Sequence, residues 1–364
     1  MQKIFLSWPT ITEEMKKEVS RVLTEEKLVM GESVFKFEEE FSNYINVDYA
    51  ISCSSGTNAL SLIIQGLNIK NEIVTTPNSF VATANTVINN NNTPVYADIS
   101  LTDGNIDPSQ VKAAISDKTS AILPVHLHGN PVKFDEIDDL VSSREIPIIE
   151  DACQAHGAYY KNRKVGSLGE AAAFSFYSTK NMTVGGDGGM ITTNNQNFAE
   201  WAISMRDTGR INGKKYEHNL VGVTSRLNTI NAAIGRIQLR DLDNYNARRI
   251  EIAQKYNKAF DSENLITLKV DSENVAVYHL YPVLIENRDL FFNKMASLGI
   301  ECGLNYPLSI PDQPFNSNQD HIRGTWKNSK IWTSKVVCLP MHANLTNSEV
   351  KYIIDSTLDV IHDL

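Results

Sequence analysis

Short apolar segments alternate with helical segments between residues 49 and 176, and this alternation constrains the fold more than any other feature. The apolar segments predict six strands, at Tyr49–Cys53, Glu72–Thr75, Pro94–Ala97, Ala121–Val125, Pro147–Ile149 and Ala172–Phe176. Helices are predicted between them, at about 57–66, 79–89, 108–115 and 133–143. Strands that alternate with helices form βαβ units, and apolar strands of this kind are covered on both faces. The sequence therefore predicts an α/β fold with a mostly parallel sheet.

Helical patterns flank this region on both sides. Apolar residues recur on one stripe in two N-terminal segments, which is typical of amphipathic helices. The flanking patterns predict helices at about 11–26, 33–45, 228–260, 288–298 and 347–362, and a strand at 275–285. At about 100–200 residues per domain, a chain of 364 residues suggests two domains. We expect a large domain at 1–250 and a smaller C-terminal α+β domain at 251–364.

The composition argues against several classes of protein. A net charge of −9 lacks the basic surface of a general nucleic-acid binder, although helix N-termini can still bind an anion locally. The four scattered cysteines form no CxxC pair, which is typical of a reduced cytosolic protein. No apolar segment approaches the roughly 18 residues of a membrane span, and the apolar start is too short for a signal peptide. We expect a cytoplasmic protein that binds neither nucleic acid nor a membrane.

Two motifs at strand ends suit an anion and a cation, respectively, because ligands of open α/β sheets bind beyond the carboxyl ends of the strands. Ser54–Leu60 follows the first strand and opens a helix, whose N–H groups suit a phosphate. Taken alone, a simple N-cap explains this motif as well. Glu150 and Asp151 end an apolar strand, where an unpaired charge is costly. They indicate either an N-cap or a carboxylate that faces a cationic ring nitrogen.

Two further motifs lie after the last predicted strand. In an apolar pocket, Lys180 would have a lowered pKa and could form a Schiff base with a carbonyl. Taken alone, it is equally a solvated loop lysine. The four glycines of Gly185–Gly189 require unusual backbone angles or a close approach, or else form a mobile loop.

Several other site types are not expected. The eight histidines form no HExxH motif and no Cys/His array, so no metal site is predicted. His126 and His128 follow a strand without an evident third ligand and are interpreted as structural or substrate-contacting. The Rossmann, Walker A and GxSxG motifs are also absent from the sequence.

Together, the motifs form an ordered set that spans the chain. The set is Ser55-Gly56-Thr57, Glu150-Asp151-Ala152-x-Gln154-Ala155-His156-Gly157, Phe174-Ser175-Phe176-Tyr177-x-x-Lys180-Asn181 and Gly186-Asp187-Gly188-Gly189. This order resembles the DegT/DnrJ/EryC1/StrS family of pyridoxal-phosphate-dependent sugar aminotransferases. The resemblance implies a fold-type-I architecture with a seven-stranded type of sheet, the cofactor pyridoxal 5'-phosphate, and a homodimer with active sites at its interface.

The resemblance also implies a role for each matching residue. Lys180 would hold the cofactor as a Schiff base and act as the general acid and base. Asp151 would face the pyridine nitrogen and keep it protonated, and Gln154 would lie beside the ring hydroxyl. The remaining cofactor-binding residues would be Ser55, Gly56, Thr57 and Ser175 at the phosphate, and Phe80 stacked on the ring.

Three positions differ from the usual family pattern. Thr224 stands where the family carries an asparagine that reaches the phosphate in the neighbouring subunit, so this contact is left open. The loop with Tyr177 and the Asn305-Tyr306-Pro307 segment also differ, and both lie on the sugar side of the family's sites. Tyr177, Tyr306 and Arg226 are the substrate-binding candidates, the last of them for a diphosphate.

The resemblance predicts an aminotransferase. Because the family's dehydratases carry histidine at the lysine position, Lys180 favours amino transfer from glutamate to a keto group of a nucleotide-linked deoxy sugar. The carbon C3 is favoured slightly over C4. Two alternatives stay open: an enzyme of the same fold acting on a free or phosphorylated keto sugar or as a dehydratase, and a non-catalytic regulatory homologue that binds the cofactor.

Overall fold

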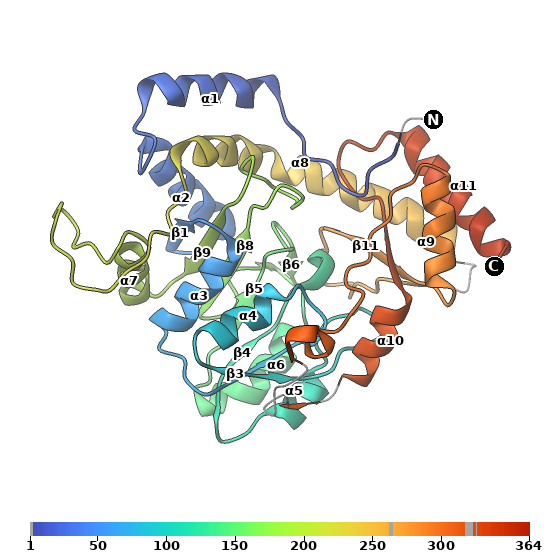
Figure 1. Cartoon of the computed structure of the whole chain (residues 1–364), viewed down its shortest axis with the longest axis horizontal. Helices are drawn as coiled ribbons and strands as arrows, with labels where there is room; N and C mark the ends of the chain where they lie inside the picture. The colour runs from blue at the N-terminus through green and yellow to red at the C-terminus, as the bar shows by residue number, and fades with distance from the viewer. Residues whose placement is uncertain (1–2, 262–264, 317–322, 325) are drawn as a thin grey trace.

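The computed structural model describes residues 3–261, 265–316, 323–324 and 326–364. At its centre lies a sheet whose strands follow the order β12-β3-β2-β4-β5-β8-β9-β1, with β4 and β5 joined by parallel bridges at Ile122–Ile148 and Val125–Asp151 (Figure 1). The strands are β1 (Tyr49–Cys53), β2 (Glu72–Thr75), β3 (Thr93–Tyr96), β4 (Thr119–Leu123), β5 (Ile149–Asp151), β8 (Ala171–Ser175), β9 (Gly189–Thr193) and β12 (Arg323–Gly324). Of these strands, β9 runs antiparallel to both of its neighbours. The predicted α/β fold with a mostly parallel sheet is confirmed.

Helices cover both faces of the sheet, and the strand residues alternate between the two cores. Ile122 of β4 packs into the core beneath one set of helices, whereas its neighbours Ala121 and Leu123 pack into the core on the other face. The helices of this region are α2 (Glu32–Ile45), α3 (Gly56–Gly66), α4 (Ala82–Asn89), α5 (Pro108–Ala114), α6 (Phe134–Val141) and α7 (Gln196–Arg206). Burial on both faces explains why these strands are apolar throughout.

The C-terminal part has its own antiparallel sheet and its own core. Its strands are β10 (Ile266–Thr267), β11 (Tyr281–Leu284) and β13 (Val336–Leu339), and its helices are α9 (Arg288–Ser297), α10 (Lys327–Lys335) and α11 (Asn347–His362). The long helix α8 (Thr229–Phe260) joins both parts (Figure 1). Leu242 of α8 packs into a core of the large part and Ile252 into that of the C-terminal part. The boundary after residue 250 lies between them and stays a proposal, and Ile4 packs with the second core.

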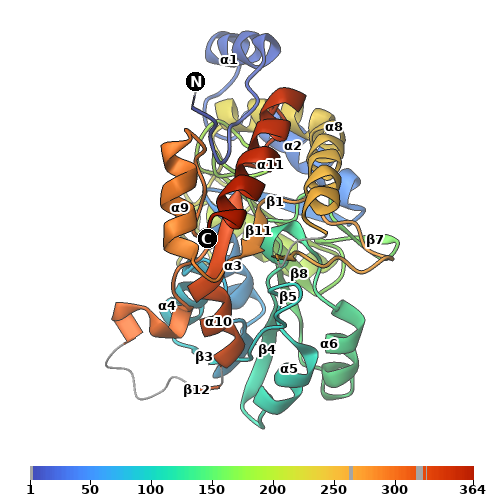
Figure 2. The ribbon, with the colours of Figure 1, turned by 90° about the vertical axis from the view of Figure 1, so that its right-hand side faces the viewer.

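The N-terminal helix α1 (Glu13–Glu25) lies along the outer side of α8, clear of the sheet (Figures 1 and 2). Thr12 caps it, because the Thr12 hydroxyl accepts from the Met15 N–H at 3.2 Å. Met15 and Val22 are buried against the body, whereas Leu23 is 55% exposed. The described residues contain no helix that is both long and apolar enough to cross a membrane.

The predicted strand at 275–285 is wrong over its first half. Only β11 belongs to a sheet, and Val275 makes a single antiparallel bridge with Tyr159. Between them, Val277 N–H and His279 N–H donate to the carbonyl oxygens of Gly129 and His128. The segment is buried from Ala276 on, but Tyr278 has a positive φ of 44°, and the segment pairs with a loop rather than with a strand. The elements β9, β13, α7 and α10 were not predicted, and neither was the short hairpin of β6 (Tyr159–Tyr160) and β7 (Arg163–Lys164).

Candidate active site

A cavity of about 520 Å³ opens at the carboxyl ends of β1, β5 and β8. It brings together ten of the twelve site residues predicted from the sequence: Ser55, Gly56, Thr57, Phe80, Asp151, Gln154, Ser175, Tyr177, Lys180 and Tyr306. Thr83, Cys153, His279 and Asn305 line it as well and were not predicted as site residues. The walls therefore come from both parts of the chain, since His279, Asn305 and Tyr306 follow α8.

The first wall of the cavity is the N-terminus of α3. Ser55 is the N-cap residue, and its hydroxyl accepts from the Asn58 N–H at 3.1 Å. A Cβ atom on Gly56 would lie 2.7 Å from Cys153 Sγ and 2.8 Å from Ser175 Cβ, so only glycine allows α3 to approach β8 this closely. The first N–H groups of a helix have no partner inside it, and they favour an anion. This wall therefore suits a phosphate group.

A buried carboxylate forms the floor. Asp151 ends β5, and its Oδ2 accepts from the Thr83 hydroxyl at 2.8 Å while its Oδ1 accepts from the Cys153 N–H at 3.2 Å. The Thr83 hydroxyl is in turn 2.9 Å from that of Ser79. These neutral donors orient the carboxylate and leave its charge available to a cationic group in the cavity. Thr83 was missed, although it lies one helical turn after Phe80 and therefore on the same face.

Gln154 and Tyr306 connect the two parts of the chain. Gln154 Oε1 accepts from the His128 N–H at 2.8 Å, which directs its Nε2 toward the Tyr306 hydroxyl at 3.3 Å. The rings of Tyr306 and Phe80 lie 6.0 Å apart between centroids, at 38° to each other. Burial raises the pKa of Tyr306, so its hydroxyl stays protonated and can donate. Two aromatic rings and an amide thus line the cavity.

Lys180 supplies the reactive amine. It follows β8 in a turn closed by a hydrogen bond from its own N–H to the Tyr177 carbonyl at 2.8 Å. Burial lowers the pKa of Lys180, although the nearby Cys153 and Asp151 act in the opposite direction. A lysine with a lowered pKa has more neutral amine near pH 7, and a neutral amine can attack a carbonyl or accept a proton.

Two predicted residues do not reach this cavity. Thr224 is exposed and bridges Asp207, and Arg226 Nη1 donates to Asp207 Oδ1 at 2.6 Å. Both lie outside the cavity of their own chain.

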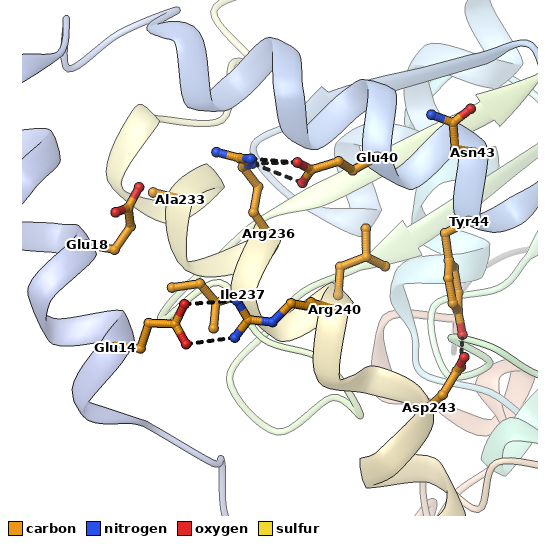
Figure 3. A pocket seen from close by; sticks show the side chains of 11 residues that line it. Glu14, Glu18, Glu40, Asn43, Tyr44, Ala233, Arg236, Ile237, Arg240 and Asp243 are labelled. Carbon is orange, nitrogen blue, oxygen red and sulfur yellow. Dashed lines mark hydrogen bonds and ion pairs between the residues drawn. The ribbon is translucent and has the colours of Figure 1, made fainter.

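Another hollow, of about 660 Å³, lies between α1, α2 and α8 (Figure 3). Most of its charged and polar groups are already paired: Arg236 with Glu40 at 2.6 Å, Arg240 with Glu14 at 2.7 Å, and Tyr44 with Asp243 at 2.6 Å. Pairs of this kind connect the helices and leave little for a ligand to bind. Among the residues that the structure describes, no group of three or more His, Cys, Asp or Glu side chains could hold a metal ion.

Comparison with known proteins finds one family that matches nearly the whole chain. The model of the DegT/DnrJ/EryC1/StrS aminotransferase family matches residues 9–358. The dTDP-3-amino-3,6-dideoxy-alpha-D-galactopyranose transaminase of Aneurinibacillus thermoaerophilus is 34% identical, over 94% of both chains. The dTDP-3-amino-3,4,6-trideoxy-alpha-D-glucose transaminase of Streptomyces venezuelae is 32% identical, over 97% of this chain and 94% of the relative.

A solved structure also matches this chain over nearly its whole length. The structure of S. venezuelae DesV in complex with a ketimine intermediate has a TM-score of 0.91 at 31% identity, over 95% of this chain and 94% of that one. The family model and the relatives cover nearly the whole chain, and the folds superpose. This chain therefore belongs to the DegT/DnrJ/EryC1/StrS aminotransferase family and is a pyridoxal-phosphate-dependent aminotransferase.

Proposed function

We propose that the cofactor binds in the 520 Å³ cavity, with its phosphate at the start of α3 and its ring over Asp151. The observation that carries this placement is that an anion-binding helix start, a buried carboxylate and Lys180 line one cavity. The absence of a side chain at Gly56 lets the start of α3 lie close to Cys153 and Ser175, which line the same cavity. Bound there, the cofactor supplies an electron sink that stabilises negative charge on the substrate carbon.

The residues of the chain then have separate tasks. Lys180 would hold the cofactor covalently through Nζ and afterwards accept and return the substrate proton. Asp151, held by Thr83, would keep the ring nitrogen protonated, and Gln154 would donate to the ring hydroxyl from the position fixed by His128. Ser55, Thr57 and Ser175 would bind the phosphate, and the exposed Phe80 would stack on the ring.

For the substrates, we propose glutamate as the amino donor and a nucleotide-linked keto deoxy sugar as the acceptor. Both transaminases compared above are named for dTDP-linked 3-amino sugars, which favours C3 as the carbon that receives the amino group. Tyr177 and Tyr306 line the cavity and would contact the sugar. Their hydroxyl and ring groups suit a polyhydroxylated acceptor with one apolar face.

Incubation of the purified protein with glutamate and a panel of nucleotide-linked 3-keto and 4-keto sugars tests this proposal. We expect 2-oxoglutarate and an amino sugar of the 3-keto series, identified by mass and NMR. A glutamate-independent loss of water from the sugar would indicate the dehydratase alternative, and turnover of the free or phosphorylated keto sugars alone would indicate the second substrate class. A protein that stays colourless with added pyridoxal phosphate would indicate a non-catalytic homologue.

We also propose that the enzyme works as a homodimer whose cavities are completed by the partner subunit. Thr224 and Arg226 lie outside the cavity of their own chain, near a loop at 208–222 that projects from the body (Figure 1, left). Tyr216 and Val221 of this loop are 81% and 96% exposed, and Phe35 of α2 is 53% exposed. Large exposed apolar side chains of this kind mark interaction surfaces. Light scattering measures the mass in solution.

A cytoplasmic location is part of the same proposal. The four cysteines are free in the structure, and three of them are buried. Free cysteines are typical of proteins in a reducing compartment.

Replacement of Gly56 by alanine is expected to weaken cofactor binding in a protein that still folds. The added methyl group would meet Cys153 Sγ at 2.7 Å and Ser175 Cβ at 2.8 Å, so α3 must shift away from β8. Overpacking of this kind costs about 1–3 kcal/mol. Titration of the apoprotein with pyridoxal phosphate measures the loss of affinity. The control is Gly299→Ala, where a φ of +77° strains alanine but the added methyl group meets nothing within 4 Å and the residue does not line the cavity. Unchanged affinity in Gly56→Ala would contradict the placement of the phosphate.

A further inference from the structure

The segment 223–226, which follows the projecting loop at 208–222, lies against the end of α7 like a short strand. The Ser225 N–H donates to the Arg206 carbonyl at 2.9 Å, and Thr224 forms an antiparallel bridge with Asp207. Successive side chains of an extended segment point to opposite faces. Thr224 is exposed, whereas Ser225 is only 1% exposed, so the Ser225 side chain faces the interior of its own chain.

Ser225 meets the turn between β1 and α3. The Ser54 N–H donates to the Ser225 carbonyl at 3.1 Å, and the two serine hydroxyls also lie 3.1 Å apart. Ser54 Oγ in addition accepts from Asn58 Nδ2 at 2.6 Å. A hydroxyl can donate one hydrogen bond and accept two, so Ser54 can hold both partners at once. It thereby connects the first turn of α3 to the segment 223–226.

This contact lies next to the anion-binding wall of the active-site cavity. Ser54 directly precedes residues 55–57, which line the cavity, whereas neither Ser54 nor Ser225 lines it. The same turn packs closely on β9, because a Cβ atom on Gly189 would lie 2.4 Å from the Ser55 carbonyl carbon and oxygen. The start of α3 is therefore supported from outside the cavity by two segments that are distant in the sequence.

A buried ion pair fixes the backbone against which Ser225 lies. Arg206 is 1% exposed, and its guanidinium pairs with Glu38 of α2. Arg206 Nη1 also donates to the carbonyl oxygen of Ser52 in β1 at 2.5 Å and to its hydroxyl at 3.0 Å. Removal of one partner from a buried ion pair is costly, so such a pair keeps its geometry. Ser225 can thus hold Ser54 from a fixed position.

We propose that Ser225 is a positioning residue for the phosphate of the cofactor and acts through the hydroxyl of Ser54. The inference rests on the proposed function, which places that phosphate at the start of α3. N–H groups that already point at an anion bind it without the cost of ordering them first. Without the Ser225 hydroxyl, the turn is less ordered and phosphate binding includes that cost. Because Thr224 and Arg226 flank Ser225, the contact also connects the phosphate site to the surface proposed for the partner subunit.

Titration of the apoprotein with pyridoxal phosphate and with pyridoxal, which lacks the phosphate, tests this proposal. We expect Ser225→Ala to raise the Kd of pyridoxal phosphate about two- to tenfold, because the loss cannot exceed the net contribution of one hydrogen bond. The Kd of pyridoxal should stay at the wild-type value. A merely structural role would weaken both ligands alike. Equal increases of the two Kd values, or no increase for pyridoxal phosphate, would overturn the proposal.

Ser61→Ala is the matched control. It removes another hydroxyl of α3, one that accepts from Asn90 Nδ2 at 3.0 Å and does not line the cavity. Both Kd values should stay at the wild-type level in this variant. Ser54→Ala removes the other hydroxyl of the proposed contact and should weaken pyridoxal phosphate at least as much as Ser225→Ala does. The double variant Ser54→Ala/Ser225→Ala should bind it as Ser54→Ala does, since two residues that act as one unit give non-additive losses. Additive losses would contradict action through Ser54.

The outcomes separate this inference from the proposed function. If the wild-type apoprotein binds pyridoxal phosphate no more tightly than pyridoxal, the proposed placement of the phosphate at α3 fails. If the wild type prefers pyridoxal phosphate and Ser225→Ala keeps the full preference, only this inference fails. If Ser225→Ala does not fold, Ser54→Ala still decides whether the contact supports the phosphate site.

Discussion

Replacement of Lys180 by alanine is expected to abolish amino transfer, with kcat lower by about 10³-fold or more. Among the described residues that line the active-site cavity, Lys180 is the one that offers a primary amine. The variant loses both the covalent attachment of the cofactor and the group that carries the substrate proton. The measurement is 2-oxoglutarate formation from glutamate with a keto-sugar acceptor.

The matched control is Lys161→Ala. Lys161 pairs with Asp135 at 2.6 Å on the surface, where an ion pair contributes about 0–1 kcal/mol. This control should keep wild-type activity, whereas borohydride reduction and mass spectrometry should find the cofactor attached at Lys180 in both the control and the wild type. Wild-type activity in Lys180→Ala would show that the assigned role is wrong.

The lowered pKa of Lys180 gives this assignment a pH signature. Burial disfavours the ammonium form, so the neutral amine is present at lower pH than in an ordinary lysine with a pKa of about 10.4. Attachment of the cofactor to the apoprotein should therefore be efficient near neutral pH. It should slow as the pH falls through the lowered pKa, because the amine then becomes protonated.

The βαβ region could be predicted from the sequence because its strands are buried on both faces. Tyr49–Cys53 forms β1 with the predicted bounds, and Ala172–Phe176 is shifted by only one residue from β8. In such strands, every residue faces a core, so the apolar segment and the strand coincide. Flanking turns then separate each strand from its helix without ambiguity.

A prediction from apolar segments fails where a buried segment does not pair with a strand, or where a strand gains its stability from its neighbours. The segment from Ala276 to Leu280 is mostly apolar and buried, but Tyr278 has a left-handed φ of 44°, and its neighbours donate N–H groups to a loop at residues 128 and 129. Strand β9 shows the reverse case. It begins at Gly189 and ends with Thr192 and Thr193, whose hydroxyls donate to the carbonyl oxygens of Gly166 and Glu170. Its stability comes from its place between β1 and β8, which no local pattern reveals.

The features of the site also fall into two groups, those that the sequence could predict and those that it could not. The motifs around Gly56, Asp151 and Lys180 are local in sequence, and a resemblance to a family could place them in one cavity. The contacts between segments could not be predicted, because Thr83 meets Asp151 across 68 positions and Gln154 meets Tyr306 across 152. Only the folded chain shows that a threonine hydroxyl orients the carboxylate.

Replacement of Asp151 by asparagine is expected to lower kcat by about 10²–10³-fold, as for loss of a preorganised electrostatic partner. Asparagine has nearly the same shape, and its amide oxygen can still accept from Thr83. It has no charge, however, and cannot keep the ring nitrogen protonated, so the electron sink is weakened. Attachment of the cofactor to Lys180 should persist, because Asp151 acts on the ring nitrogen rather than on the covalent link. Activity within tenfold of the wild type would contradict the assigned role.

Thr83→Val separates the charge of Asp151 from its orientation. The hydroxyl of Thr83 donates to Asp151 Oδ2 at 2.8 Å, and a hydrogen bond to a charged group contributes about 1.5–3 kcal/mol. The single variant should therefore lose about tenfold or somewhat more in kcat, less than Asp151→Asn. If Thr83 acts only through the carboxylate, the double variant Thr83→Val/Asp151→Asn should have the same kcat as Asp151→Asn alone. Non-additive losses of this kind mark residues that act as one unit. Additive losses would mean that Thr83 contacts the cofactor or the substrate directly.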